Sequence, residues 1–455
     1  MSFPRYPKYK DSGVEWLGEV PEHWGVQRLK RICRVFPSNV DKKSVEGETA
    51  VLLCNYTDVY YNDRIVAGME FMPATATDDQ IAKFTLRAGD TIITKDSETA
   101  DDIAVAAFIP NDLPGVVCGY HLSMVRPLEG IDGAFVKRLF DSTYAKSCFA
   151  VRANGLTRVG LSQYELDNVD MPVPPSTEQT AIASFLDRET AKIDGLIAEQ
   201  QRLIELLQEK RQAVISHAVT KGLNPDALMK DSGIEWLGEV PEHWEVIPLK
   251  RVADIQTGVA KGKNNSGKTT ISVPYLRVAN VQDGYLDLSE VTALDIPADE
   301  LDRYALRAGD VLMNEGGDFD KLGRGCIWEG QLNPCISQNH VFAVRPRRIS
   351  SQWLNAITGS GYAQFYFMSR SKQSTNLASI SSTNLMELPV ILPPNEEQAG
   401  ILAFMARQTS LFASLTTEAT QAITLLQERR AALISAAVTG QIDVRGFSSG
   451  GSEAA

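Results

Sequence analysis

The stretch KDSGVEWLGEVPEHW at 10–24 returns as KDSGIEWLGEVPEHW at 230–244, with fourteen of its fifteen residues identical. Other matching pairs keep the same spacing along the chain, namely LRAGD at 86–90 and 306–310, VRP at 125–127 and 344–346, and QEKRQAVISHAVT at 208–220 with QERRAALISAAVT at 427–439. A period of about 220 residues is far longer than that of solenoid or propeller repeats, and each copy can bury its own core. The chain is therefore predicted to be one module written twice.

The composition is that of an ordinary globular protein, since 44% of the 455 residues are apolar and 22% are charged. The start, MSFPRYPKYKDSG, lacks the apolar stretch of a secretion signal, and no run of about 18 apolar residues follows. A cytoplasmic protein without a membrane segment is expected. The six cysteines form no CxxC pair and no zinc-like spacing with the five histidines, so we expect buried free thiols, no metal and no cofactor.

Both copies follow one plan, in which a box of charged and aromatic residues precedes a variable domain and a helix. The variable domains contain short β-branched runs separated by Gly, Asn and Asp turns, as in DTIIT at 90–94. The predicted fold class is α+β, with two strand-rich domains each followed by a long helix. The predicted divisions are an N-terminal box at 1–32, a first variable domain at 33–170, a central helix at 171–222, a linker and repeated box at 223–252, a second variable domain at 253–389, a C-terminal helix at 390–443 and a flexible tail at 444–455.

A long helix is predicted over 176–220, because STEQ forms a capping box with Ser176 or Thr177 at the N-cap and no proline follows. Positions alternately four and three apart give an apolar heptad seam in each helix. The predicted seam residues are Ile182, Leu186, Ile193, Leu196, Leu203, Leu207 and Val214 in the first helix, and Ile401, Met405, Phe412, Leu415, Leu426 and Leu433 in the second. Each helix could pack on its own domain, but the stripe favours pairing of the two as an antiparallel coiled coil, a rod on the order of 65 Å long.

The formal net charge of −12 argues against a polyanion partner, because Lys and Arg drive phosphate binding by displacing counterions. Basic residues nevertheless gather locally, in KGKNNSGK at 261–268 and in VRPRR at 344–348. A basic surface on the second variable domain is compatible with DNA binding, with weak affinity unless a partner adds positive charge.

The segment GKNNSGKT at 262–269 fits the P-loop pattern GxxxxGK[ST]. A true P-loop lies between a buried strand and a helix whose N-terminus holds the phosphates. The residues that follow, TISVPYLRV, favour a strand, and no downstream apolar run ends in an Asp suited to magnesium. We therefore interpret the loop as a flexible basic turn, with nucleotide binding as the weaker alternative.

That turn is the leading candidate for DNA contact, because lysines reach phosphates and asparagines pair with adenine edges. The alternative is a solvated loop that touches nothing. The predicted DNA-binding residues are Lys261, Lys263, Asn264, Asn265 and Lys268 in this turn, Lys321 and Arg324 in GDFDKLGRG, and, more weakly, Lys42, Lys43, Arg64, Lys95 and Ser97 in the first domain.

The aromatic residues of the two boxes are predicted to be packing anchors, since the boxes repeat almost unchanged whereas surfaces that read sequence should diverge. These residues are Trp16, Trp24, Trp236 and Trp244, with His23 and His243 beside them as structural groups. The helix ends around Lys210, Arg211, Arg429 and Arg430 are equally compatible with solvent and with a partner surface.

The EWLGEVPEHW box, the variable domain with an LxxGD strand, the PPxxEQ helix start and the QEKRQAVISHAVTKG helix end resemble the specificity subunit of a type I DNA restriction-modification system. The resemblance covers nearly the whole chain, twice. It implies that the variable domains are target recognition domains, each reading one half of a split site on double-stranded DNA. It also implies that the paired helices fix the gap and dock two modification (methyltransferase) subunits, with a restriction subunit where the system has one.

The resemblance assigns adenine methylation, ATP hydrolysis and cleavage to partner chains, so this chain is predicted to be a non-enzymatic recognition subunit. The absence of (N/D)PP(Y/F), GxGxxG, GxSxG and HExxH motifs agrees with that division. Two other functions stay open: a P-loop nucleotide-dependent switch acting through Lys268, and a coiled-coil scaffold that does not read DNA.

Overall fold

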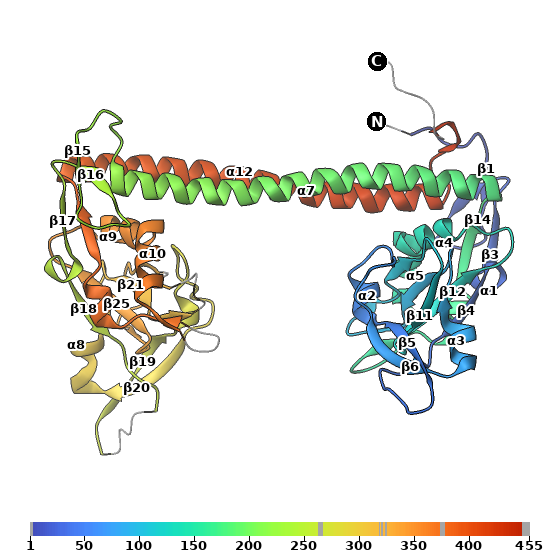
Figure 1. Ribbon diagram of the computed structural model, residues 1–455, viewed down its shortest axis with the longest axis horizontal. Coiled ribbons are helices and arrows are strands. Elements are labelled where there is room, and N and C mark those ends of the chain that lie inside the picture. The colour runs from blue at the N-terminus through green and yellow to red at the C-terminus, as the bar shows by residue number, and fades with distance from the viewer. Residues whose placement is uncertain are drawn as a thin grey trace. The chain divides into compact units, whose positions relative to one another are not determined.

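The computed structural model describes residues 3–262, 267–317, 319, 322–323, 325–373 and 378–447. The chain divides into two compact units: unit 1 is Met1–Gln201 with Thr420–Ala455, and unit 2 is Arg202–Ala419. Two long helices, α7 (Ser176–Lys221) and α12 (Asn395–Val438), each contribute one segment to both units (Figure 1). The mixture of strand-rich domains and long helices confirms the predicted α+β class.

Unit 1 contains a domain built on two four-stranded sheets. The antiparallel sheet has the order β10-β8-β12-β4 and consists of β4 (Cys33–Pro37), β8 (Thr91–Thr94), β10 (Ala106–Phe108) and β12 (Leu122–Pro127). The second sheet has the order β6-β5-β11-β7 and consists of β5 (Thr49–Cys54), β6 (Met72–Ala76), β7 (Thr85–Leu86) and β11 (Leu113–Cys118). Strands β5 and β11 are parallel, and the other pairs are antiparallel.

The antiparallel sheet is buried on both faces, because successive side chains of a strand point to opposite sides. Ile92 and Met124 belong to the core between the two sheets, whereas Ile93 and Val125 belong to the core beneath the helices. That second core is covered by α4 (Gly133–Asp141) and α5 (Thr143–Ala150) and continues into α7 and α12. Burial on both faces explains why DTIIT reads as a continuous β-branched run.

Smaller elements complete unit 1. They are β1 (Tyr9–Asp11), β2 (Glu19–Pro21), β3 (Gly25–Arg28), α1 (Leu29–Ile32), α2 (Tyr56–Tyr60), α3 (Asp78–Phe84), β9 (Asp96–Ser97), η1 (Ala100–Asp102), β13 (Val159–Gly160), α6 (Gln163–Asp167), β14 (Asp170–Val173) and η6 (Arg445–Phe447). Strand β1 pairs with β2, β3 with β14 and β9 with β13.

Unit 2 repeats this strand order with a four-stranded sheet, β18-β25-β21-β23, and a three-stranded sheet, β20-β19-β24. The strands of these sheets are β18 (Ala253–Thr257), β19 (Thr270–Leu276), β20 (Thr292–Pro297), β21 (Val311–Asn314), β23 (Gly325–Ile327), β24 (Ile336–Ser337) and β25 (Val341–Pro346). The remaining elements are β15 (Met229–Asp231), β16 (Glu239–Pro241), β17 (Glu245–Pro248), η2 (Leu249–Arg251), η3 (Val278–Asn280), η4 (Ala298–Glu300), α8 (Leu301–Tyr304), β22 (Gly316–Gly317), α9 (Ser351–Thr358), α10 (Gly361–Arg370), β26 (Lys372–Gln373), β27 (Ala378–Ser379), α11 (Ser382–Met386) and β28 (Pro389–Leu392).

The repeated LRAGD and VRP segments meet in space within each domain. The carboxylate of Asp90, which is 1% exposed, accepts two hydrogen bonds from the guanidinium of Arg126, at 2.8 and 2.7 Å. Asp310 holds Arg345 in the same way, at 2.7 and 2.8 Å. A bidentate pair of this kind fixes the turn before one strand to the end of its neighbour, so the two motifs form part of the scaffold.

The repeated boxes fasten the helix ends. In unit 1 the buried indole of Trp24 donates to Glu178 at the start of α7, at 3.0 Å, and packs against Gly440, just beyond the end of α12. In unit 2 Trp244 donates to Glu397 at the start of α12, at 2.8 Å, and packs against Gly222 at the end of α7. Each box therefore joins the beginning of one helix to the end of the other.

Both glycines have a positive φ, of +75° at Gly440 and +78° at Gly222, which suits the residue that ends a helix. A Cβ at Gly440 would lie 2.3 Å from Pro21, whereas one at Gly222 would lie 3.1 Å from Trp244. The prediction of packing anchors is right for Trp24 and Trp244, and wrong for Trp16, which is 57% exposed.

The prediction that STEQ forms a capping box is wrong, because the described side chains bond elsewhere. The side-chain oxygen of Gln179 accepts from the backbone N–H of Asp132 at 2.8 Å, and its amide donates to the carbonyl of Pro174 at 2.9 Å. Glu178 is engaged by Trp24. The repeated PPxxEQ motif therefore ties the helix start to the domain instead of capping the helix.

Within unit 1 the first segment of α7 lies antiparallel to the last segment of α12. Glu178 is 3.8 Å from Arg445, whereas Asp194, sixteen residues further along α7, pairs with Arg430 at 2.8 Å. In unit 2 the end of α7 and the start of α12 share one apolar core, which includes Ala218, Val219, Ile401 and Met405.

The buried residues of α7 form a seam that, in part of the helix, is shifted by one residue from the predicted seam. The predicted members that are buried are Ile182, Leu186, Ile193 and Leu207, and Val214 is partly buried. The assignment of Leu196 and Leu203 is wrong, because they are 48% and 42% exposed, whereas Ile197 and Ile204 are partly buried. The buried Thr190 adds a second step of four after Ile182 and Leu186, and the step of three to Ile193 completes an eleven-residue repeat, which is close to the helical period.

The buried seam of α12 is also shifted by one residue from the predicted seam at one point. Predicted members that are buried are Ile401, Met405, Phe412 and Leu433, and Leu426 is partly buried. Leu415 is 37% exposed, so its assignment is wrong, and the partly buried Thr416 lies in the seam instead. The heptad rule thus identified most of the buried seam and was wrong at Leu196, Leu203 and Leu415, where a neighbouring residue is more buried.

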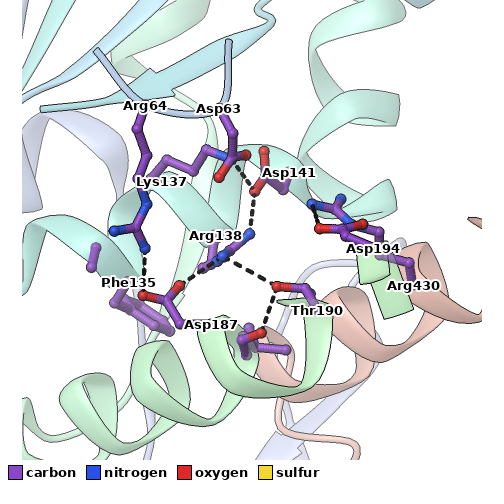
Figure 2. Close-up of polar contacts among 12 residues, drawn as sticks. Asp63, Arg64, Phe135, Lys137, Arg138, Asp141, Asp187, Thr190, Asp194 and Arg430 are labelled. Atoms are coloured by element: carbon purple, nitrogen blue, oxygen red, sulfur yellow. Dashed lines mark hydrogen bonds and ion pairs between the residues drawn. The ribbon is translucent and has the colours of Figure 1, made fainter. Parts of the chain in front are cut away.

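A cluster of charged side chains joins the unit 1 domain to α7 (Figure 2). We call it the junction cluster; its members are Asp63, Arg64, Lys137, Arg138, Asp141 and Asp187. Asp187 receives Arg138 at 2.6 Å and Arg64 at 2.7 Å, and Lys137 pairs with Asp141 at 2.7 Å and with Asp63. The side chains of Lys137 and Arg138 are only 4% and 5% exposed, so their charges depend on these carboxylates.

The electrostatics of the junction cluster follow from burial and pairing. Burial alone would lower the pKa of Arg138, but the hydrogen bond to Asp187 and the charges of Asp141 and Asp63 outweigh it, so the pKa is raised. Burial alone would raise the pKa of Asp63, but Lys137 and Arg138 hold it below its ordinary value.

The six cysteines are free and buried, as predicted. Burial raises the pKa of the Cys33, Cys326 and Cys335 thiols to about 12, which keeps them protonated at neutral pH. Among the described helices, none is long and apolar enough to span a membrane.

Candidate nucleic-acid interface

A histidine and a carboxylate form a pair at the same place in both domains, where the turn before the VRP strand meets the end of a neighbouring strand. In unit 1 the Nδ1 atom of His121 lies 2.9 Å from the carboxylate of Asp96. In unit 2 the Nδ1 atom of His340 lies 2.7 Å from that of Glu315. The two histidines occupy matching positions of the shared framework, whereas their carboxylates come from adjacent positions, since Asp96 matches Gly316.

The side chains around the pair differ between the domains. In unit 1 the ammonium of Lys95 lies over the ring of Tyr120, 4.4 Å from its centroid, and Arg158 contacts Asp96 at 3.0 Å. Tyr120 is 50% exposed, so one face of this cation–aromatic pair is open to a ligand. Such a pair offers a positive charge for phosphate and a ring on which a base can stack.

Further tyrosines extend this surface. The rings of Tyr56 and Tyr60 stack with centroids 5.6 Å apart, and the Tyr60 hydroxyl donates to Asp102 at 2.7 Å. The hydrogen bond to Asp102 and the charge of that carboxylate raise the pKa of Tyr60 to about 12. Tyr60 is therefore a neutral donor at physiological pH, held on α2.

In unit 2 the position of Lys95 is taken by Glu315, the carboxylate of the pair, and that of Tyr120 is taken by Asn339. Asn339 donates its amide toward the Nε2 atom of His340 at 3.3 Å, and Asn314 is buried and donates to the carbonyl of Val281 at 2.9 Å. A cavity of about 440 Å³ opens beside the histidine, lined by Val278, Glu315, Gly316, Gly317, His340, Ala378 and Ser379. The second domain thus presents the amide of Asn339 and a hollow where the first presents a cation and a ring.

Some predicted contacts lie on this surface and others do not. Lys95 lies on it, whereas Ser97 is 2% exposed, so its hydroxyl is inaccessible. Arg64 is engaged by Asp187 in the junction cluster, which favours a structural role. Lys42 and Lys43 are exposed after β4, and Lys43 is 3.6 Å from Asp41.

In the second domain Lys261 is exposed, and Lys268 pairs with Glu300 at 3.3 Å while staying half exposed. Five predicted contacts fall outside the described residues, namely Lys263, Asn264, Asn265, Lys321 and Arg324. Thr269 is followed directly by β19, which pairs with β20 and β24. A strand in this place lacks the helix N-terminus on which a P-loop depends, which favours a recognition turn over a nucleotide site.

Sequence reasoning missed the residues that surround the histidine pair, namely Tyr56, Tyr60, Tyr120, Arg158, Asn314 and Asn339. One signal was present, because both histidines precede the VRP strand and the residue before each of them differs. Within the described part of the chain, no group of three or more His, Cys, Asp or Glu residues is arranged to hold a metal.

Comparison with known proteins shows which proteins this chain is similar to. Residues 241–425 match the family model described as the type I restriction modification DNA specificity domain. The type I restriction enzyme EcoKI specificity subunit of Escherichia coli K12 is 25% identical over 298 residues, 63% of this chain and 60% of that protein. The MjaVIII specificity subunit of Methanocaldococcus jannaschii is 24% identical over 438 residues, 94% of each chain.

Solved structures agree at the level of the fold. A chain from a structural study of complex assembly in the type I R-M system covers 92% of this chain with a TM-score of 0.68 and 18% identity. The HsdS subunit from Thermoanaerobacter tengcongensis covers 92% with a TM-score of 0.51 and 18% identity. The domain model and the curated relatives indicate a type I restriction-modification specificity subunit, which confirms the resemblance found in the sequence, and the solved structures agree in the fold.

Proposed function

We propose that the chain is the non-catalytic subunit that reads a bipartite sequence on double-stranded DNA. The observation that carries this proposal is the pairing of a shared framework with different side chains at one place in both domains. His121 and His340 each hold a carboxylate, while Lys95 and Tyr120 in one domain give way to Glu315 and Asn339 in the other. Two readers of different half-sites require this combination.

The target recognition domains in this proposal are 33–170 and 253–389. The exposed Lys42, Lys43, Lys261 and Lys268 and the partly buried Lys95 contact phosphates, and Tyr120 and Asn339 face the bases. The helices pair as an antiparallel coiled coil along their length, and the order in which α7 contacts α12 and the residues that follow it in unit 1 supports this arrangement. Two modification subunits, and a restriction subunit where present, carry out methylation of adenine and cleavage, and extrusion of the target base takes place in the methyltransferase pocket.

Basic partner chains also offset the negative net charge of this chain, which opposes DNA binding. A chain with a formal net charge of −12 has little long-range attraction for DNA, so a complex in which modification subunits supply basic surface is expected to bind far more tightly than this chain alone.

Modified-base sequencing of DNA tests the proposal. Cells that express this chain with its neighbouring methyltransferase should carry methyladenine on both strands of a split motif, and cells without this chain should not. Exchange of residues 253–389 for the corresponding domain of a relative should change one half of the motif and leave the other. An unchanged motif after the exchange would support a scaffold without readout, and methylation that does not depend on this chain would refute the proposal.

A further inference from the structure

A cavity of about 540 Å³ lies within unit 2, between the domain and the helix segments that it contacts. Its walls come from α7, α12 and α9, through Arg211 and Ile215, Met405 and Ala413, and Asn355. This volume is in the range of small-molecule and side-chain binding sites.

The cavity occupies the place that the junction cluster fills in unit 1. The matching helix segments 208–220 and 427–439 relate α7 in unit 2 to α12 in unit 1, so Arg211 corresponds to Arg430. The same hydrogen bond also recurs, since Ser435 accepts from the N–H of Thr143 at 2.8 Å and Ser216 accepts from that of Gly361 at 2.8 Å. The two junctions are therefore built alike at their edges.

The centre of the junction differs. The positions of Arg138, Asp187 and Asp194 in unit 1 are taken in unit 2 by Ala356, Ala406 and Ala413. All three alanines line the cavity. Exchange of one arginine and two aspartate side chains for methyl groups leaves the hollow.

Arg211 keeps the position of Arg430, but Ala413 replaces the aspartate with which Arg430 pairs. Arg430 holds Asp194 with two hydrogen bonds, at 2.8 and 3.3 Å. Arg211 is partly buried in the cavity wall and forms no hydrogen bond or ion pair among the residues that the structure describes. A planar guanidinium favours a carboxylate that it can bind with two parallel hydrogen bonds.

The other residues that line the cavity indicate which kind of ligand it can bind. Ile215, Leu402 and Met405 offer an apolar wall, which a small inorganic anion would leave unused. Asp283, which is exposed at the cavity, repels a second negative charge, so a ligand with one carboxylate fits better than a polyanion.

We propose that this cavity binds a segment of a partner protein in which one acidic residue lies next to an apolar residue. The carboxylate pairs with Arg211 as Asp194 pairs with Arg430, and the apolar side chain packs on Ile215, Leu402 and Met405. The corresponding place in unit 1 is already filled, so only one such segment binds per chain. This inference does not depend on which DNA sequence is read.

Arginine side-chain NMR of the full chain tests the proposal with two neutral-ended dipeptides, N-acetyl-leucyl-aspartyl amide and its matched control N-acetyl-leucyl-asparaginyl amide. The aspartyl probe should shift the Nε–H resonance of Arg211, assigned with Arg211→Gln, in a saturable manner, and the asparaginyl probe should not. Ala413→Asp should shift the same resonance without any probe and abolish the response, whereas the matched variant Ala413→Asn should keep it.

Three results would overturn the proposal. An equal response to both dipeptides would show that the carboxylate is not recognised. An equal response to acetate or to inorganic phosphate would reduce the cavity to a general anion site. A response to the aspartyl probe that survives in Ala413→Asp would place the probe elsewhere, and the internal shift in that variant shows whether the chain is folded at the site.

Discussion

Trp24 donates its indole N–H to the carboxylate of Glu178 at 3.0 Å, and this bond joins the first repeated box to the start of α7. The same carboxylate receives the Tyr6 hydroxyl at 3.2 Å and contacts the His23 ring at 2.7 Å. Among the described residues, the partners of its counterpart Glu397 are Trp244 and His243. Glu178 also lies 3.8 Å from Arg445 and is more deeply buried, so loss of its carboxylate should cost the first box more stability.

Replacement of Glu178 with alanine should therefore destabilise unit 1 by about 3 kcal/mol, because buried donors on Trp24 and Tyr6 lose their acceptor. The corresponding change at Glu397, whose side chain is 42% exposed, should cost about 1 kcal/mol, since water can replace it. Urea unfolding with hydrogen exchange measures both, and Glu178→Gln, which keeps an acceptor oxygen, is the control. Equal losses for the two alanine variants would contradict the argument.

The junction cluster should behave as one coupled unit. Asp187→Ala leaves Arg138, 5% exposed, without its main carboxylate, and a loss of about 3 kcal/mol is expected. The double variant Arg138→Ala with Asp187→Ala reproduces Ala356 and Ala406 of unit 2 and should be more stable than the two single losses predict, by about 2 kcal/mol. A double-mutant cycle measured by chemical unfolding provides the coupling energy, and additive losses would refute it.

Low pH should lower the stability of unit 1, because two of its carboxylates become protonated and lose their paired charge. Although burial opposes it, Lys137 keeps the pKa of Asp63 below its ordinary 3.8, and the hydrogen bond from Arg445 does the same for Asp443. A lowered pKa in the folded state means that stability is present above the ordinary value and is lost as the pH falls through the folded value. The loss should therefore begin below about pH 4.

The unfolding free energy of Asp63→Asn, followed between neutral pH and pH 3, should depend less on pH than that of the native chain. The control is Glu46→Gln, which changes an exposed carboxylate and should leave the dependence as it is. Identical pH profiles for the native chain and Asp63→Asn would show that the pairing with Lys137 adds no pH-dependent stability.

Much of the fold could be predicted because it is local or repeated. The helix Ser176–Lys221 follows from apolar periodicity and the absence of proline, and the scaffold role of LRAGD and VRP follows from their recurrence. The seam phase could not be predicted, because Leu196 and Ile197 are equally apolar and only the position of the partner helix decides which one is buried.

The candidate site was harder to predict for a different reason. Lys137 meets Asp63 across 74 residues of sequence, and His121 meets Asp96 across 25, so neither pair has a local pattern. Arg64 was predicted as a DNA contact from its charge alone, and its partner Asp187 became visible only in the folded chain. Charge in a sequence identifies a group that needs a partner without identifying the partner.

The surface around His121 should carry DNA readout by the first domain. Lys95→Ala removes one phosphate contact, so the slope of log affinity against log salt should fall by about 1, whereas Tyr120→Ala removes a stacking platform and should cost about 1–3 kcal/mol. Both are measured by DNA binding of the complex with modification subunits. Lys10→Ala, an exposed change in the box, is the matched control and should leave both quantities unchanged. If Lys95→Ala behaves like Lys10→Ala, this face of the domain does not meet the duplex, and the phosphate contacts must lie with Lys42 and Lys43 instead.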